Sequence, residues 1–337
     1  MSILKTNAIT DIMDGNTTTI NGILLNAGAL EPDDRIINGD FGVWQRGTSF
    51  TTSAYGADRW VNAFVGGAVT QSRQAFAIGD TLNANSPTYF LRQAVSGQSL
   101  GTHYAQIAQR IENVRSYAGQ TITVLGWARR FSGVGNMSVE GAQEFGTGGT
   151  PSTTITGISP TIVTLTDTWA PFAVVLNVPS ITGKTLGANG NDSFTICFWS
   201  SAGSSFNARA NSLGLQTIAV DLWGIHIKRG IHSVNTTDLY RPRDPGTELT
   251  LCYRYYENFT TGFMGWSAGA GVITGTYSKF YPKRVTPIAT NISVTESVNL
   301  SQAPMNVWSR DSFRYYGVSG AAGNMYATAL WAFDAEL

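Results

Sequence analysis

The sequence has little charge, few histidines and almost no cysteine. Only 13% of its 337 residues are charged, and 22 basic residues balance 22 acidic ones. A net charge near zero gives no basic field to attract a nucleic acid backbone, so we expect no nucleic-acid partner. The three histidines (His103, His226 and His232) lack the paired spacing of a metal site. The two cysteines, Cys197 and Cys252, are too few for a disulfide framework.

Long apolar runs and export signals are also missing. No run approaches the ~20 residues that a membrane helix needs. Residues Met1–Leu30 lack the basic and apolar regions of a signal peptide. We therefore expect a protein that is made in a cytosol and does not insert into a membrane.

The common catalytic motifs are absent from the sequence as well. It has no G-x-S-x-G elbow, no H-E-x-x-H pair and no complete phosphate loop. Glycoside cleavage would need two carboxylates about 5–9 Å apart. The candidate carboxylates show no recognisable pairing motif: Asp58, Glu112, Glu140, Glu144 and Asp221. We expect a protein that is not an enzyme, with a glycan depolymerase as an alternative.

What the sequence does contain favours an all-β fold. Aromatic residues make up 11% of the chain, and its 37 glycines are more than the usual glycine frequency of ~7% would give. Alternating apolar residues predict strands at Thr121–Arg129, Phe172–Val178 and Phe194–Phe198. Between Thr217 and Arg229 the apolar residues change parity, which predicts a β-bulge or a change of sheet near Leu222–Trp223.

Turn-rich boundaries divide the chain into three segments. Residues 1–35 contain two short extended pieces, Ile3–Thr10 and Thr17–Leu25, each too short to bury its apolar side alone, so we expect each to pair with something outside this segment. This segment is interpreted as an N-terminal attachment arm and linker. Residues 36–245 are predicted to form a β-sandwich. Residues 246–337 are predicted to form a smaller C-terminal β-domain, which begins with a short helical face over Thr247–Tyr256.

The chain also carries a family resemblance. Ile36–Trp60 contains N-G-D-F (Asn38–Phe41), W-Q-R-G (Trp44–Gly47) and A-D-R-W (Ala57–Trp60). With Q-R-I-E at Gln109–Glu112, this pattern resembles the jelly-roll, carbohydrate-binding-like module of bacteriophage tail-fibre and receptor-binding proteins. Further matches at Gly119–Thr123, Gly246–Leu249, Cys252–Glu257 and Phe333–Leu337 extend the resemblance over most of the chain from Ile36 onward.

The resemblance implies a virion protein that recognises a glycan of the host surface without catalysis. It implies a homotrimer on a phage tail, assembled in the host cytoplasm, that contacts other virion proteins through residues 1–35. A purely structural adaptor or head fibre without a host ligand is the second interpretation.

Host contact is expected in the C-terminal β-domain, as far as possible from the arm. Sugar rings present apolar C–H faces that stack on aromatic planes, and arginine holds acidic groups. The candidate ligand-binding residues are Trp266, Arg310, Phe313, Arg314, Tyr315 and Tyr316. The rival interpretation places the same aromatic residues at a subunit interface.

Two further expectations concern the sandwich. Its core is predicted to close around five aromatic residues: Trp44, Trp60, Trp127, Phe172 and Phe198. A weaker hypothesis gives Asp40 and Asp221 to a structural Ca²⁺, which prefers oxygen ligands. The alternative is that Asp40 caps its own turn and Asp221 bonds to nearby backbone. No other cofactor is expected.

Overall fold

The computed structural model describes residues 19–20, 23–24, 34–82, 85–234 and 240–337. The chain divides into two compact units, Met1–Arg35 and Ile36–Leu337. In the first unit, β1 (Thr19–Ile20) pairs antiparallel with β2 (Ile23–Leu24). The second extended piece of the arm, Thr17–Leu25, therefore contains a strand pair of its own, and its pairing with something outside the arm stays a prediction. The first piece, Ile3–Thr10, lies outside the described residues.

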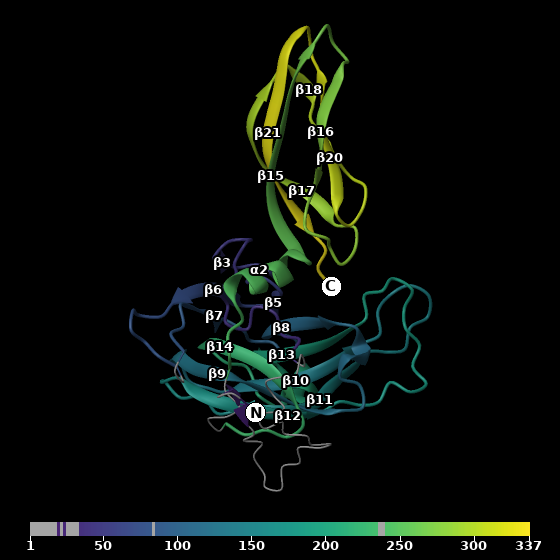
Figure 1. Cartoon of the computed structure of the whole chain (residues 1–337). Coiled ribbons are helices and arrows are strands. Elements are labelled where there is room, and N and C mark those ends of the chain that lie inside the picture. The colour runs from purple at the N-terminus through teal and green to yellow at the C-terminus, as the bar shows by residue number, and fades with distance from the viewer. Residues whose placement is uncertain (1–18, 21–22, 25–33, 83–84, 235–239) are drawn as a thin grey trace, which may run out of the picture. The chain divides into compact units, whose positions relative to one another are not determined.

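The first part of the chain after Ile36 forms a jelly-roll β-sandwich of two six-stranded antiparallel sheets (Figure 1). The first sheet has the order β11-β10-β13-β8-β5-β4 and the second β12-β9-β14-β7-β6-β3. Successive strands switch repeatedly between the two sheets, as the expected fold requires. The strands are β3 (Ser49–Phe50), β4 (Ala54–Tyr55), β5 (Trp60–Val65), β6 (Ala68–Ala75), β7 (Tyr89–Ser96), β8 (Tyr104–Glu112), β9 (Thr121–Gly133), β10 (Met137–Glu144), β11 (Ile155–Val163), β12 (Ala170–Asn177), β13 (Ser193–Ala202) and β14 (Ile218–Arg229).

The main core lies between these two sheets. Trp44, Trp60, Phe172 and Phe198 all belong to it, as predicted. Trp127 does not: it is half-buried and packs in a separate aromatic cluster that includes Phe90, Trp223 and Tyr240. Neighbouring residues of β9 point to opposite faces of the sheet, and Trp127 points away from the main core. The prediction for Trp127 was therefore wrong.

The expected irregularity in β14 is a bulge. Leu222 pairs with Ala128 and Trp223 with Trp127, but the register then shifts before His226 pairs with Leu125. Gly224 sits in this shift with φ +67°, a left-handed conformation that favours glycine. Because of the extra residue, apolar side chains on both sides of the bulge enter the same core. They are Ile218, Val220 and Leu222 before it, and Ile225 and Ile227 after it. Trp223 is buried on the other face.

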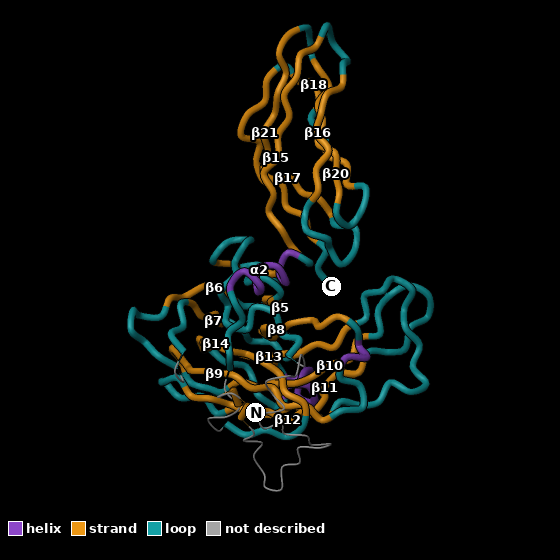
Figure 2. Tube along the Cα trace, viewed as in Figure 1, coloured by secondary structure: helices purple, strands orange, loops and turns teal. Residues whose placement is uncertain are grey.

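Strands also dominate the C-terminal segment (Figure 2). It begins with helix α2 (Pro245–Tyr253), which lies where a helical face was expected and is capped by Asp244. One sheet has the order β15-β21-β17; in the other, β16, β20 and β18 follow in order and β19 also pairs with β20. The strands are β15 (Tyr256–Ser267), β16 (Ile273–Lys279), β17 (Ile288–Val298), β18 (Leu300–Gln302), β19 (Met305–Val307), β20 (Ser312–Ser319) and β21 (Gly323–Asp334).

The N-G-D-F motif forms a turn that ties the start of the sandwich together. Asn38 has φ 58°, and its carbonyl accepts from Phe41 N at 3.1 Å. Its side-chain amide donates to Val43 O at 2.8 Å and to Asp58 O at 3.1 Å. The indole of Trp60 donates to Asn38 O at 2.9 Å. The motif therefore links to the later A-D-R-W motif through buried polar contacts.

The two arginines of these motifs contact the C-terminal segment. Arg46 lies 3.6 Å from the ring centroid of Tyr256, and Arg59 lies 3.5 Å from that of Tyr255. Both arginines form ion pairs with the nearly buried carboxylate of Glu336. These contacts give the two arginines a structural role at the junction between the two β-domains.

Other polar contacts extend this junction. Arg110 Nη1 and Tyr55 Oη both donate to Leu337 O, at 2.6 and 3.0 Å. Arg254 forms an ion pair with Glu112 at 2.9 Å. The Q-R-I-E motif thus also serves the junction, through Arg110 and Glu112.

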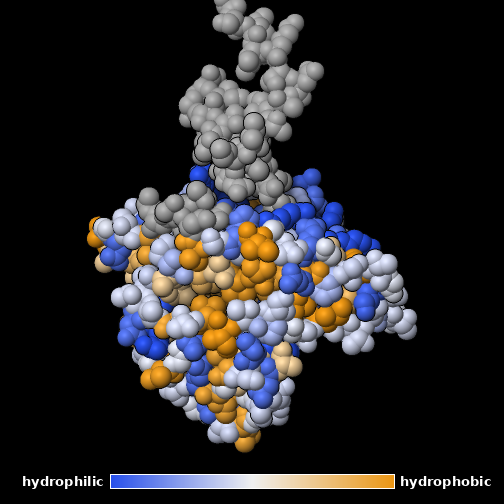
Figure 3. Space-filling view, turned by 90° about the horizontal axis from the view of Figure 1, so that it is seen from below, coloured by the Kyte–Doolittle hydropathy of each residue, from blue (hydrophilic) through white to orange (hydrophobic). Residues whose placement is uncertain are grey.

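Hydrophobic side chains reach the surface in several places. Figure 3 shows them as orange patches that interrupt the hydrophilic surface on the face seen from below. Single exposed apolar residues are ordinary on protein surfaces, so only clusters of them indicate a binding surface.

In the described part of the chain, no helix has the length and apolar character to cross a membrane.

Candidate functional site

Strand β20 separates the predicted ligand-binding residues into two groups. Phe313 is 1% exposed and Tyr315 is fully buried, and both belong to the core of the C-terminal β-domain. Arg314 and Tyr316 alternate with them on the outer face. Phe313 and Tyr315 therefore cannot stack on a ligand, and their prediction was wrong. The period of two in a strand allows only one parity to face outward.

An aromatic surface forms around the outward residues of β20. Register places Tyr277 of β16 opposite Arg314 on one side and Asn306 of β19 opposite it on the other. Directly opposite residues of an antiparallel pair share one face. Trp308, just beyond β19, packs on Tyr277 with ring centroids 5.1 Å apart. Tyr277 and Trp308 are 61% and 58% exposed.

The guanidinium of Arg314 joins this surface to Tyr316. Its central carbon lies 4.6 Å from the Tyr316 ring centroid and 5.3 Å from that of Tyr277. We call the four residues Tyr277, Trp308, Arg314 and Tyr316 the aromatic platform. Two of them, Arg314 and Tyr316, were predicted from the sequence; Tyr277 and Trp308 were not among the candidate ligand-binding residues.

A glycine gives Tyr316 the space beside it. Gly275 of β16 pairs with Tyr316, and a Cβ on Gly275 would meet the Tyr316 Cβ at 2.4 Å. The absence of a side chain at this position leaves the strand backbone open next to the ring. Any larger residue at position 275 would displace Tyr316 or the strand.

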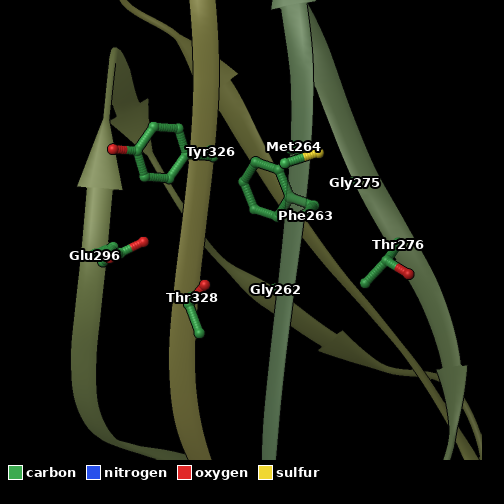
Figure 4. A pocket seen from close by; sticks show the side chains of 8 residues that line it. All are labelled: Gly262, Phe263, Met264, Gly275, Thr276, Glu296, Tyr326 and Thr328. Carbon is green, nitrogen blue, oxygen red and sulfur yellow. The ribbon is translucent and has the colours of Figure 1, made fainter.

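A groove of about 650 Å³ reaches the same glycine. Figure 4 shows its lining along four strands, β17, β21, β15 and β16. The lining residues are Gly262, Phe263, Met264, Gly275, Thr276, Glu296, Tyr326 and Thr328. Gly262 pairs with Thr328, which in turn pairs with Glu296, so these three form one row across the sheet.

The groove and the aromatic platform meet at strand β16, because Gly275 belongs to the groove lining and pairs with Tyr316. Glu296 contributes a carboxylate to the groove, and Arg314 contributes a guanidinium to the platform. Met264, 84% exposed, and the ring of Tyr326 rise on one side of the floor formed by Gly262. A flat floor with aromatic and polar walls suits an extended ligand built of flat, hydroxylated rings.

Trp266 and Arg310, the other predicted ligand-binding residues, are not part of the aromatic platform. Trp266 is 66% exposed and pairs with Asn324 on β21, two residues along β15 from Met264. Arg310 is exposed, and its Nη1 donates to Arg284 O at 3.3 Å. Both side chains are open to solvent, but neither forms a ring contact within the described residues.

Each candidate catalytic carboxylate is paired with arginine. The ion pairs are Asp58 with Arg46 at 3.7 Å, Glu112 with Arg254 at 2.9 Å, Glu140 with Arg209 at 2.6 Å, Glu144 with Arg110 at 3.3 Å, and Asp221 with Arg92 at 2.6 Å. Burial raises the pKa of Asp58 to about 6 and also raises the pKa of Glu140. These pairs hold strands and domains together.

The two residues assigned to Ca²⁺ have other partners. Asp221 is fully buried, and its carboxylate accepts from Arg92 at 2.6 and 2.8 Å and from Arg129 at 2.8 Å. A cation at this carboxylate would be repelled by two guanidinium groups. Asp40 accepts from Gly42 N at 3.2 Å, which caps its own turn. Among the described residues, no group of three or more His, Cys, Asp or Glu is arranged to hold a metal ion.

A second, smaller cleft lies on the sandwich. Its volume is about 300 Å³, and its lining includes Phe76, Phe90 and Trp169 together with Arg129. The ring centroid of Trp169 lies 5.3 Å from that of Phe76 and from that of Phe90. Arg129 is already paired with Asp221, so this cleft offers aromatic rings and a neutralised guanidinium.

Comparison with known proteins finds likeness in structure alone. No protein-family model matches the chain, and no curated protein does. A putative sugar binding protein from Bacteroides thetaiotaomicron is 13% identical with a TM-score of 0.37; the alignment covers 58% of this chain and 100% of that one. A CBM4 structure is 14% identical with a TM-score of 0.32, covering 57% and 98%. The CBM22-1 xylan-binding domain from Paenibacillus barcinonensis Xyn10C is 11% identical with a TM-score of 0.30, covering 55% and 94%. At such low scores the fold assignment rests on the strand pairing given above.

Proposed function

We propose that this protein binds a glycan without catalysis, through the outer face of its C-terminal β-domain. The observation that carries the proposal is the aromatic platform with the adjoining groove. Tyr277 and Trp308 are each more than half exposed, although their rings lie in contact with centroids 5.1 Å apart. Sugar rings would cover these rings with their C–H faces, and the hydroxyl groups would bond to Arg314, Asn306 and Thr328.

The same face offers little for a hydrolytic reaction. The groove lining includes one carboxylate, Glu296, whereas glycoside cleavage needs two on either side of the scissile bond. The carboxylates named from the sequence are paired with arginine elsewhere. Binding without cleavage is therefore the better-supported function, and reducing-sugar release from the bound polysaccharide would contradict it.

The setting that we propose is a phage tail fibre or receptor-binding subunit. The motifs Asn38–Phe41, Trp44–Gly47 and Ala57–Trp60 support this setting by their resemblance to such proteins. In this setting, residues 1–35 attach to another virion protein, and the platform meets a polysaccharide of the host surface. The junction formed by Arg46 and Arg59 would then transmit load between the two β-domains.

A homotrimer belongs to the same proposal. Strand β17 lies at the edge of its sheet, and ten of its eleven residues are exposed. Its exposed aliphatic side chains are Ile288, Ile292, Val294 and Val298, from 40% to 74% exposed. An unpaired edge with apolar side chains favours association with further copies of the chain.

Glycan binding by purified variants tests the function. Oligosaccharides released from the host surface are titrated calorimetrically into the full chain, so that binding is monovalent. Trp308→Ala and Tyr277→Ala should each weaken binding at least about tenfold, because each removes one stacking ring. Both positions are exposed, so folding should be preserved and is checked by thermal unfolding.

The sandwich cleft supplies the matched control. Trp169→Ala removes an aromatic ring of the same kind from the other candidate surface. If binding survives Trp169→Ala and is lost in Trp308→Ala, the platform is the site. If the reverse holds, the site lies on the sandwich and the proposed location is wrong.

A further inference from the structure

The charge of one platform residue defines the class of glycan, if the proposed function holds. The side chain of Arg314 forms no ion pair and no hydrogen bond among the described residues. By contrast, Arg129 in the sandwich is paired with the carboxylate of Asp221, and Arg59 at the junction is paired with that of Glu336. Arg314 is thus a cation on an exposed aromatic face without an anionic partner.

Arg314 is also held in place. Tyr277 and Tyr316 both lie against the guanidinium, with ring centroids 5.3 and 4.6 Å from its central carbon. Its Nε is buried without an acceptor, and the terminal nitrogens are not among the buried unsatisfied atoms. The two tyrosines therefore cover one part of the guanidinium, and its outer N–H groups face solvent. A guanidinium held in this way needs little further ordering to bind a planar anion in two parallel hydrogen bonds.

The neighbouring charges agree with an anionic ligand at this end of the surface. Lys279 is exposed on the same outer face of β16, two residues from Tyr277. Glu296 lies in the groove, in the row formed with Thr328 and Gly262. A negatively charged group of a ligand is attracted to Arg314 and Lys279 and repelled by Glu296.

From this geometry we infer that the platform selects an anionic glycan, with the acidic group of one sugar bound by Arg314 and a neighbouring ring stacked on Tyr277 and Trp308. The acidic group is a carboxylate or a phosphate, since both accept two hydrogen bonds from a guanidinium. Neutral stretches of the same chain occupy the glycine-floored groove toward Glu296.

A polysaccharide array tests this inference. Each acidic bacterial polysaccharide is printed beside its carboxyl-reduced form, and each phosphate-containing one beside its dephosphorylated form. The full chain should bind at least one acidic member about tenfold or more tightly than its neutralised counterpart. The pair that shows this ratio identifies the anion as carboxylate or phosphate. Binding to the acidic form should weaken as the salt concentration rises.

Variants separate charge recognition from a structural role. Arg314→Gln should reduce the acidic-to-neutral ratio to about one, because binding of the acidic form should weaken far more than binding of the neutral form. Arg314→Lys should keep part of the ratio, because the charge remains and the planar pair of donors is lost. Arg115→Gln, at an exposed arginine of the sandwich, is the charge-matched control and should change neither.

The outcomes distinguish this inference from the proposed function. If no polysaccharide binds, the proposed function fails. If polysaccharides bind but the acidic and neutral forms bind equally, the proposed function stands and the inference is wrong. If Arg314→Gln weakens binding of the acidic and neutral forms equally, Arg314 only supports the tyrosines and the inference is wrong. If Arg115→Gln lowers the acidic-to-neutral ratio as much as Arg314→Gln does, the charge attraction is unspecific and the inference is also wrong.

Discussion

Arg59 donates to the carboxylate of Glu336 across 277 residues of sequence, in a setting where both side chains are at least 95% buried. The guanidinium also lies over the ring of Tyr255 at 3.5 Å. Residues at the start of the sandwich thus fix the end of the C-terminal β-domain. The A-D-R-W motif is explained by this contact and by the burial of Trp60.

Removing one partner of this pair should be costly. Glu336→Ala leaves the charge of Arg59 buried without its partner, and such changes cost about 3–5 kcal/mol of unfolding free energy. Asp167→Ala is the matched control, because its ion pair with Arg130 is at the surface and Asp167 is 77% exposed; it should cost no more than about 1 kcal/mol. Urea denaturation measures both. Equal losses would mean that the junction contributes no more than a surface pair.

The pH dependence of stability should carry a signature of Asp58. Burial raises its pKa in the folded protein to about 6, above the ~3.9 of an unfolded chain. The folded state therefore binds this proton more tightly, so the contribution of Asp58 is greatest below about pH 4 and falls as the pH rises to 6. A shift of about two units corresponds to at most about 3 kcal/mol.

Comparison with Asp58→Asn isolates this contribution. The unfolding free energy is measured between pH 4 and pH 7 for both proteins. The variant should lose less stability over this range than the parent, because it lacks the titration of Asp58, whereas the raised pKa values of Asp40 and Glu140 affect both proteins alike. Parallel pH profiles would contradict the assignment.

A chelator should leave thermal stability unchanged. Arg92 and Arg129 already occupy the carboxylate of Asp221, so no calcium ion is needed to neutralise it. Asp221→Asn should instead lower the unfolding free energy by about 3 kcal/mol or more, since two partly buried guanidinium groups lose their partner. A fall in melting temperature with chelator that added Ca²⁺ restores would support the metal hypothesis instead.

Self-association can be measured directly. The full chain should have the mass of a trimer in light scattering at micromolar concentration, and Val294→Asp, on the exposed edge strand β17, should shift it toward the monomer. Thr290→Asp, at an exposed polar position of the same strand, is the control. A stable monomer of the parent protein would contradict the homotrimer.

The alternation of apolar residues predicted more than the existence of strands. In β14 the change of parity predicted the bulge, because the need to bury both Leu222 and Ile225 leaves few other solutions. The same rule, applied to β20, would have separated Phe313 and Tyr315 from Arg314 and Tyr316. A strand cannot present adjacent residues on one face, so grouping these four as ligand-binding residues was the avoidable error.

Other features depend on register, which the sequence does not state. Tyr277 and Trp308 are 31 positions apart, and only the pairing of β16 and β19 with β20 brings them together. Asp221 meets its arginines in the same way, from β7 and β9 on either side of β14. Trp127 lies in a predicted strand, but which face of that strand is inside depends on the position of the second sheet.

Hydrogen exchange in the presence of a bound polysaccharide tests the central claim most directly. The polysaccharide is the tightest binder found on the array, and exchange of backbone amides is compared with and without it. Exchange should become slower in β16, β19 and β20, around Tyr277, Trp308 and Tyr316, and should not change in the sandwich strands. Protection confined to the sandwich, around Phe76 and Trp169, would contradict it.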